Sequence, residues 1–582
     1  MKQLIRRVIA FLLIAGSPVA NAAAQIVRLD QAPAQDAAQG GALPTQERTP
    51  QRVGVDESNP LMLTLFDAVK LALQNNREIE VERINVQQAN YDLFSARGAR
   101  DVTLGASSFF EHRVLPAGSV LAGGPNGTIT TKGANWDFGA QQLMPSGAQW
   151  TAQFTNLRSD TNSVFNSLNP QYSSVLNFQI RQPLLRNFSM DDARRRIRVA
   201  NRRLDLSDSQ FRQKAIEIVS RVQRSYWDLV FGLREVQIQR EAVDLARAQR
   251  ERNSRMVDQG TLAPIELVSV DVELERRREN VLTALEVVTR AENALKQLIL
   301  GDRGSAEWNK PIIPTETPDL TVISMKLDEA LAAAFANRPE LAQNNAQQEI
   351  NKIDTRYFSN QAKPAVDLIA SYATTGLAGT PVTTAGSPFT ATTDLLVARV
   401  NTLSELASLP PLTVAPPASV PGFLVGGYGQ SLSSVFSNDF RTFRFGVSFS
   451  FPIRNRSAEG QLGRSLAEGR KIGTQRQILE QSIEAEVRNA LQSVEMGRER
   501  VETARASREA AEKQYQSEQR RFDSGLSTTY FVLERQNTLS ESRGRELRAL
   551  TEYNKALAEL QRVMGTTLTS ANVEVSPPES KR

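Results

Sequence analysis

Two long helical patterns, each interrupted by a short glycine-containing segment, constrain the fold of this chain more than any other feature. At residues 190–300, and again at 463–565, apolar residues recur at alternating steps of three and four. This spacing keeps one face of a helix against partner helices over many turns. Gly260 and Gly525 interrupt the two patterns, and glycine adopts the left-handed backbone of a tight turn without steric cost. The patterns predict two long antiparallel helical hairpins.

Other segments also occur twice and in the same order. A Leu-x-[Asp/Glu]-Ala-[Val/Leu] helix start occurs at 65–69 and at 327–331, and Pro183 and Pro452 each close a strand-like run. Fixed-order repetition is the mark of a duplicated unit. We therefore predict an internal two-fold repeat, with one copy at 61–315 and the other at 316–569.

The N-terminus has the features of a secretory signal peptide, predicted at residues 1–22. A basic flank precedes a short apolar run and an Ala-Asn-Ala cleavage site. The chain has no cysteine, so we expect neither disulfides nor an N-terminal lipid anchor. A flexible segment is expected at 23–60, a helix from Thr64 to Arg97, and a disordered tail at 570–582.

Strand-like sequence replaces the helical pattern at residues 102–184 and again at 365–453. Polar and apolar residues alternate around 175–181, and the run 443–451 places four phenylalanines on one face. Such alternation is typical of a membrane barrel wall with lipid outside and water inside. A soluble two-sheet sandwich would also alternate, although the phenylalanines favour the barrel. A long insert rich in Pro, Gly, Thr and Ser is expected at 374–438 as an outward-facing loop.

The composition excludes most catalytic chemistry. The chain has one histidine, and its net charge of +5 comes from bases interleaved with acids along the helices. That interleaving indicates solvated helix faces rather than nucleic-acid binding. No phosphate-binding or dinucleotide motif is present. We expect no enzyme activity, no cofactor and no metal site.

Acidic residues near the two turns are the best candidates for a functional site. They are Asp258 and Glu266 at the first turn, and Asp523 and Glu534 at the second. In a bundle of several chains these acids would repeat around an axial opening and attract cations. For Asp258 and Asp523, helix capping and dipole complementarity explain the same positions equally well.

Taken together, these features resemble the TolC family of outer-membrane efflux proteins. The similarity extends over about 61–565 and rests on the paired helix starts, the paired strand ends and the turn 521–526 followed by 532–536. The resemblance implies an α+β membrane protein in which long antiparallel coiled-coil hairpins form a periplasmic tunnel. It also implies a homotrimer whose chains each contribute four strands to one transmembrane β-barrel in the outer-membrane lipid. A periplasmic adaptor and an inner-membrane pump of the RND, ABC or MFS type are the implied partners.

The resemblance also suggests roles for individual residues. Glu534 matches an acidic residue of the entrance ring, and Glu266 matches one in the network that holds the entrance shut. Phe531 and Ser527 replace a ring aspartate and a gate-linking arginine, so the gate here is expected to be more apolar. The residues that match adaptor-contacting tips are Gly260, Thr261, Leu262, Gly525, Leu526 and Ser527.

The sequence features are therefore consistent with three functions. The first is the exit duct of a tripartite efflux system, and the second is the duct of a type I protein secretion system. The third is an exported coiled-coil structural or adhesive protein without a channel. An extra hairpin expected at 133–158 either adds strands to the barrel wall or caps its outer mouth.

Overall fold

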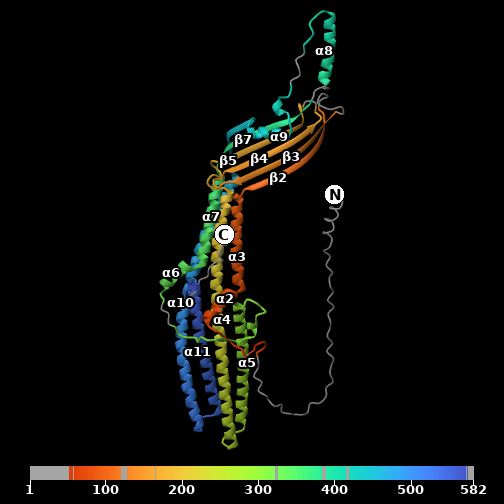
Figure 1. Cartoon of the computed structure of the whole chain (residues 1–582). Helices are drawn as coiled ribbons and strands as arrows, with labels where there is room; N and C mark the ends of the chain where they lie inside the picture. Colours follow the sequence, from red (N-terminus) through yellow and green to blue (C-terminus); the bar gives the residue numbers. More distant parts are fainter. Residues whose placement is uncertain are drawn as a thin grey trace, which may run out of the picture. The chain divides into compact units, whose positions relative to one another are not determined.

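The computed structural model describes residues 52–118 except 57, 127–163, 166–321, 325–382, 388–413, 419–571 and 573. All elements below belong to the unit Arg52–Arg582, which combines long helices with one large sheet (Figure 1). The predicted signal peptide lies outside the described residues, as do most of the segment 23–60 and of the tail 570–582. Those three predictions are therefore not tested.

Four long helices form two antiparallel hairpins. They are α4 (Asp192–Asp258) with α5 (Ile265–Ile299), and α10 (Arg456–Asp523) with α11 (Thr529–Val563). The apolar seams are buried between them, which is why the sequence spacing predicted helices packed along one face. Fully buried seam residues include Ala215, Val219, Val222, Tyr226, Leu229, Ile483 and Val487. The helix expected to begin at 463 in fact begins at Arg456.

One helix was expected from Thr64 to Arg97, but the structure has two, α2 (Leu65–Asn75) and α3 (Arg77–Arg97). Thr64 caps α2, because its Oγ1 accepts a hydrogen bond from the Asp67 N–H at 3.0 Å. The break occurs because the Asn76 side chain accepts from the N–H of Glu78 at 2.9 Å and so begins a second helix.

The second half of the chain has a corresponding break. There α6 (Leu327–Asn337) and α7 (Pro339–Gln361) are separated by Arg338. Proline at the first position of α7 disfavours a helical conformation for the residue before it, which explains the break.

Each break lies against the end of a hairpin helix. The Asn76 side chain donates to the Leu298 carbonyl of α5 at 2.9 Å, and the Arg338 Nε donates to the Val563 carbonyl of α11 at 2.8 Å. Both contacts satisfy carbonyls that a helix C-terminus otherwise leaves unpaired. Glycine follows each hairpin because a Cβ at Gly301 or at Gly565 would lie within 3 Å of a backbone oxygen of the adjoining helix.

The packing of α3 against α4, next to the break at Asn76, is expected to weaken in acid. Hydrogen bonds from Arg221 and then Lys214 lower the pKa of Glu78 from 4.5 to about 2. A depressed carboxyl pKa contributes stability above the unfolded-state value, and this stability is lost as pH falls from about 4.5 towards 2. The melting temperature in detergent should therefore fall more between pH 6 and pH 3 for the wild type than for Glu78→Gln. Equal falls would contradict the prediction.

The described unit also contains a six-stranded antiparallel sheet. Its order is β2 (Thr103–Pro116), β3 (Thr128–Leu143), β4 (Gln149–Thr161), β5 (Leu168–Pro183), β7 (Ala365–Pro381) and β8 (Arg441–Ser450). The expected hairpin at 133–158 is β3–β4, and it pairs with β2 on one side and β5 on the other. The hairpin therefore adds strands to the sheet. The four strands per chain that the resemblance implied are too few.

The sheet has two unlike faces. The register aligns Ala152 with Phe178, Phe178 with Tyr372, and Tyr372 with Phe443, so one face carries a band of large apolar side chains. Members of this band include Leu104, Phe110, Trp136, Phe138, Phe154, Leu176, Phe178, Phe443, Phe445, Val447 and Phe449. The opposite face is mainly polar and carries Asn135, Asp137, Gln141, Gln153, Asn177, Gln179, Ser371 and Arg444.

The insert expected as a loop at 374–438 differs from that prediction in two ways. Strand β7 continues to Pro381, because small residues from Thr374 onward still pair with β5. The remainder contains two helices, α8 (Pro388–Leu406) and α9 (Tyr428–Ser437). The Pro, Gly and Ser content favoured a loop, but in α9 the small side chains of Ser431 and Ser434 are buried against the sheet.

The remaining elements are short. A parallel pair joins β1 (Leu61–Leu63) to β6 (Ile312–Pro314). The others are the 3-10 turns Gly98–Arg100, Ala306–Asn309 and Gly422–Leu424, and the terminal helix α12 (Thr567–Ser570).

Candidate functional site

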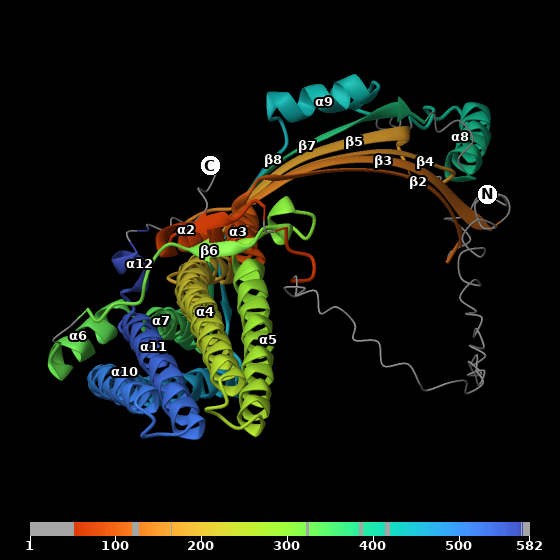
Figure 2. The same cartoon turned by 90° about the horizontal axis from the view of Figure 1, so that it is seen from below.

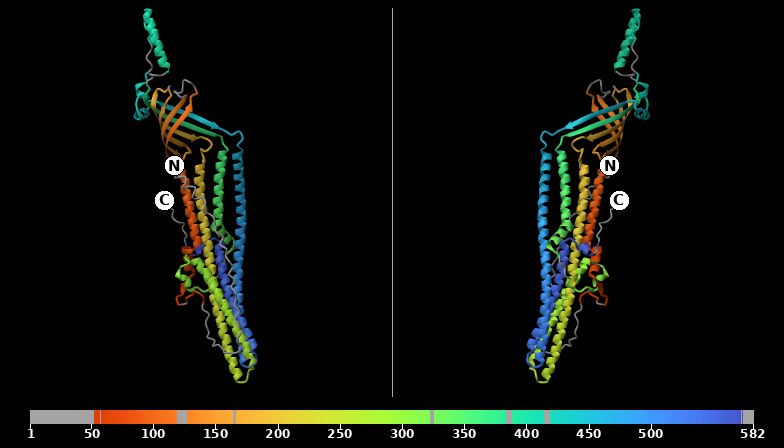
Figure 3. Two further views of the ribbon diagram at one scale, coloured as in Figure 1. Left: turned by 90° about the vertical axis from the view of Figure 1, so that its right-hand side faces the viewer. Right: turned by 90° about the vertical axis from the view of Figure 1, so that its left-hand side faces the viewer.

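The two hairpin turns are built alike and lie at the same end of the helices (Figure 3). In the first, Gly260 has a φ of +73°, and its N–H donates to the Val257 carbonyl at 2.9 Å. The next N–H, of Thr261, donates to the Met256 carbonyl at 2.9 Å. This pair of bonds satisfies the last carbonyls of α4, as in a Schellman motif.

The second turn repeats this pattern around Gly525, which has a φ of +70°. Its N–H donates to the Phe522 carbonyl at 3.0 Å, and the Leu526 N–H donates to the Arg521 carbonyl at 2.9 Å. The Leu526 side chain is 72% exposed. Ser527 donates through its hydroxyl to the Glu518 carboxylate, so it is tied to α10.

Gly525 is expected to tolerate asparagine much better than valine. A Cβ there would meet no atom within 4 Å, so the cost comes from the left-handed backbone alone. That cost is about 1–2 kcal/mol for ordinary residues, whereas asparagine adopts this conformation readily. Gly525→Val should lower the melting temperature of the helical hairpins, measured by circular dichroism in detergent, while the sheet region still assembles, and Gly525→Asn should be near wild type. An unchanged melting temperature in Gly525→Val would count against the strain expected at this turn.

The predicted acidic residues do not share one environment. Asp523 accepts hydrogen bonds from Arg252 of α4 at 3.1 Å and from Gln519 at 3.2 Å. Asp258 and Glu534 are exposed and Glu266 is half-buried, and within the described part of the chain none of these three makes an ion pair. Asp523 therefore links the two hairpins, whereas the other three carboxylates are left unneutralised near the turns.

Phe531 lies on the first turn of α11 and is 46% exposed. Its ring packs edge-on against that of Tyr530, with 5.5 Å between centroids, and Tyr530 is 68% exposed. The second hairpin thus presents two neighbouring aromatic side chains beside its turn. Exposed aromatic residues of this kind are typical of surfaces that contact another protein.

A second contact between the hairpins was missed from the sequence. Buried Asn253 of α4 donates to the Thr529 hydroxyl at 3.1 Å and accepts from Gln249 at 2.8 Å. Together with the Arg252–Asp523 pair, it holds the end of α4 to the second hairpin just above the turns. A polar residue in the apolar seam was the available sequence signal.

Arg277 is the third link, and only 2% of its side chain is exposed. Its guanidinium donates to Glu273 of its own helix at 2.8 Å and to the Ala242 carbonyl of α4 at 2.6 Å. It also donates to Asn537 of α11 at 3.0 Å. Arg277 therefore joins three helices, and it stands at a seam position between Leu274 and Val281.

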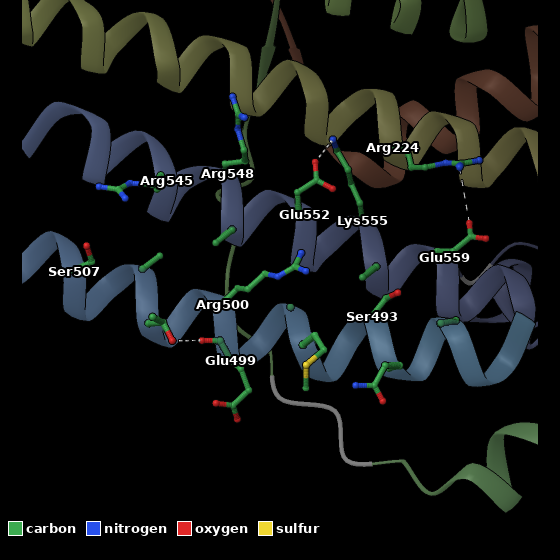
Figure 4. Close-up of a pocket in the computed structure, with 18 residues that line it drawn as sticks. Arg224, Ser493, Glu499, Arg500, Ser507, Arg545, Arg548, Glu552, Lys555 and Glu559 are labelled. Carbon is green, nitrogen blue, oxygen red and sulfur yellow. Dashed lines mark hydrogen bonds and ion pairs between the residues drawn. The ribbon is translucent and has the colours of Figure 1, made fainter. Parts of the chain in front are cut away.

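A groove with a volume of about 1100 Å³ runs between α10 and α11 (Figure 4). Both charges line it: Arg224, Arg500, Arg545, Arg548 and Lys555 alternate with Glu499, Glu552 and Glu559. Lys555, for example, pairs with Glu552 at 3.0 Å and also with Asp228. The groove therefore has two more basic than acidic residues, and nothing further in the described residues points to a particular ligand.

Two absences concern only the part of the chain that the structure describes. No group of three or more His, Asp or Glu side chains in these residues is placed to hold a metal ion. Among the described helices, none has a stretch long and apolar enough to cross a membrane.

Comparison with known proteins identifies the family. The model of the outer membrane efflux protein family matches residues 134–301 and 420–566, which together make up more than half of the chain. Among curated proteins, none matches this chain.

Solved structures with the same fold are outer-membrane channels. The CmeC channel of Campylobacter jejuni is 13% identical with a TM-score of 0.57, and the match covers 89% of this chain and 87% of that one. CusC is 14% identical with a TM-score of 0.57, covering 91% and 99% respectively. The open-state MtrE channel of Neisseria gonorrhoeae is 13% identical with a TM-score of 0.54, covering 87% and 89%. At these identities the likeness shows the fold, and the family model supplies the assignment: this chain belongs to the outer membrane efflux protein family.

Proposed function

We propose that this protein is the exit duct of a tripartite efflux system, conducting substrates passively from the periplasm to the exterior. The observation that supports this most directly is the sheet with one apolar and one polar face, continuous in the chain with two long helical hairpins. A structural or adhesive coiled coil has no need of such a sheet. A type I protein secretion duct would share these features, and no contact at the turns favours it.

The proposed assembly is a homotrimer with a closed barrel. Strands β2 and β8 are the sheet edges, 14 and 10 residues long. Unpaired edges are not tolerated in lipid, so each edge needs a partner strand. Because the six strands alternate in direction, β8 of one copy would meet β2 of the next antiparallel.

The number of strands would give this barrel a lumen wide enough to hold water. Three copies with six strands each would make eighteen strands. Barrels of about 16–18 strands leave an aqueous channel. The wall would place the apolar band against outer-membrane lipid and the polar face towards the lumen.

The hairpin turns are the proposed periplasmic end of the duct. Asp258, Glu266 and Glu534 would bring unpaired carboxylates close to a three-fold axis and favour cations there. The links made by Arg252, Asn253 and Arg277 would keep the entrance narrow. Phe531 would add an apolar collar at the same level.

The turns themselves are the proposed contact with a periplasmic adaptor, which would connect the duct to an inner-membrane pump. Their exposed backbones and the Leu526 side chain are available for a protein contact. The residues proposed for this role are Gly260, Thr261, Leu262, Gly525, Leu526 and Ser527. The pump would be of the RND, ABC or MFS type.

The proposal also includes the chain organisation inferred from the sequence. Export would use a cleaved signal peptide at 1–22 without lipidation, followed by a flexible segment at 23–60. The repeats at 61–315 and 316–569 are supported by their matching helices: α4 and α10 have 67 and 68 residues, and α5 and α11 have 35 each.

Single-channel conductance in a planar bilayer tests the duct and its acidic entrance together. Wild-type protein is expected to give small, cation-preferring steps, and Glu534→Ala to reduce the cation preference measured from the reversal potential in a salt gradient. Removing one carboxylate per chain removes three charges from the proposed ring, which is why the effect should be measurable.

The matched control is Glu541→Ala, an exposed acid on α11 about two helical turns further from the tip. It should alter the cation preference less than Glu534→Ala does. Equal effects would contradict a ring at Glu534. A membrane-inserted oligomer without conductance in wild type and in variants that break the hairpin links would contradict the duct.

A further inference from the structure

Helix α9 lies along one face of the sheet, over β5 and β7 (Figure 2). The Ser431 hydroxyl donates to the Ser174 hydroxyl at 3.0 Å, and the Thr374 hydroxyl donates to the Val435 carbonyl at 3.0 Å. The Tyr172 ring lies 6.4 Å from that of Tyr428. Because Tyr172, Ser174 and Thr374 share the face of Leu176 and Phe178, the helix is on the side with the phenylalanine band.

A glycine on β7 allows this helix to approach the sheet closely. Gly376 pairs with Ser174, and a Cβ at Gly376 would lie 1.8 Å from the Ser431 carbonyl oxygen. Ser431, Ser434 and Val435 of α9 are buried against the strands. A close approach of this kind needs glycine on the strand and small residues on the helix.

The helix covers the place where the apolar band of the wall ends. On β5 and β7, beyond Leu176 and Tyr372, the same face carries mainly the small residues Ser174, Thr374, Gly376 and Ala378, with Tyr172 among them packed against Tyr428 of α9. Apart from Tyr172, these side chains are too small to offer an apolar outer surface. The helix lies over them and takes the place of the missing band.

The segment that forms α9 carries no charge, although exposed Asp439 and Arg441 follow it directly. From Gly422 to Asn438 the sequence contains no Asp, Glu, Lys or Arg. Phe436 is 76% exposed, and Phe423 and Phe440 are 53% and 42% exposed with ring centroids 5.9 Å apart. Aromatic residues at the edge of an apolar band are typical of the boundary between lipid and water.

We propose that α9 is an interfacial helix that inserts Phe436, with Phe423 and Phe440, among the acyl chains at the outer boundary of the membrane. It would extend the lipid-facing surface of the wall where the strands themselves lack large side chains. The inference rests on the proposed function, because it requires the phenylalanine band to face lipid. The partner argued for is lipid, since α9 itself carries no charge and its surface is continuous with that band.

Site-directed spin labelling of the oligomer in liposomes tests this without ambiguity, because the chain has no native cysteine. A nitroxide at Phe436→Cys should collide readily with oxygen and poorly with a water-soluble nickel chelate, as lipid-exposed labels do. Phe445→Cys reports the band and Gln153→Cys the polar face. The first should behave like a lipid site and the second like a water site.

The controls separate the two proposals. If the Phe445 label is lipid-exposed but the Phe436 label collides with the nickel chelate, the helix proposal is wrong and the duct proposal stands. If the Phe436 label is shielded from both reagents, α9 contacts a neighbouring copy, and the lipid inference is also wrong. If the Phe445 label is in water, the proposed function itself fails.

A second variant checks that the strand contact positions the helix. Gly376→Val should displace α9 and raise nickel accessibility at the Phe436 label, with no change at the Phe445 label. Gly446→Val is the matched control, because a Cβ at Gly446 would meet no atom within 4 Å. An unchanged Phe436 label in Gly376→Val would overturn the proposed packing.

Discussion

Replacing Arg277 with alanine is expected to lower the free energy of unfolding of the helical hairpins by about 3–5 kcal/mol. The change removes a buried cation. The carboxylate of Glu273, which is only 11% exposed, loses its ion pair with the Arg277 guanidinium. The change also leaves the Ala242 carbonyl and the Asn537 amide oxygen without a donor. The expected loss of stability is larger than the net energy of the hydrogen bonds themselves, because the remaining buried polar groups are left unpaired.

The measurement is thermal unfolding followed by circular dichroism in detergent, combined with limited trypsin digestion. Arg277→Ala should melt earlier, and its hairpins should be cut near the turns. Arg276→Ala is the matched control: its side chain is 56% exposed and pairs with the same Glu273 carboxylate at 2.8 Å. An exposed pair contributes at most about 1 kcal/mol. Equal destabilisation by the two variants would contradict the special role of Arg277.

Replacing Phe445 with arginine is expected to prevent most of the protein from inserting into vesicles. Phe445 lies within the apolar band of β8 and is 63% exposed in the single chain. In a barrel wall its side chain would face lipid, where an arginine costs about 2–4 kcal/mol at the membrane midplane. Three copies would bear this cost together, since each chain contributes one β8.

Ser448→Arg is the matched control on the same strand. Ser448 pairs with Asp367 on the polar face, so the added cation would enter a water-filled lumen. This variant should insert normally and shift the channel's preference towards anions. The readout for both is the fraction protected from protease in vesicles. Equal insertion of the two variants would mean that the face with the phenylalanines does not contact lipid.

The hairpins, their turns and the presence of two-faced strands could be predicted from the sequence because each depends on local spacing. Steps of three and four between residues such as Ala215 and Val219 select a helix with one buried face. Glycine at 260 and 525 permits the left-handed turn, and alternation from Phe443 to Phe449 selects a strand with unlike faces. Neighbouring residues determine these features, so no distant contact was needed.

Contacts between distant segments decided the rest. The break at Asn76 is capped locally, but its contact with the end of α5 joins segments more than two hundred residues apart. The six-stranded sheet depends on which strands lie on either side of β3–β4. Arg277 looked like one more charge on a solvated helix until packing placed Ala242 and Asn537 around it. Helix α9 came from a segment whose composition favoured a loop. Its conformation is stabilised by the close contact with Gly376, and only the tertiary structure brings those two segments together.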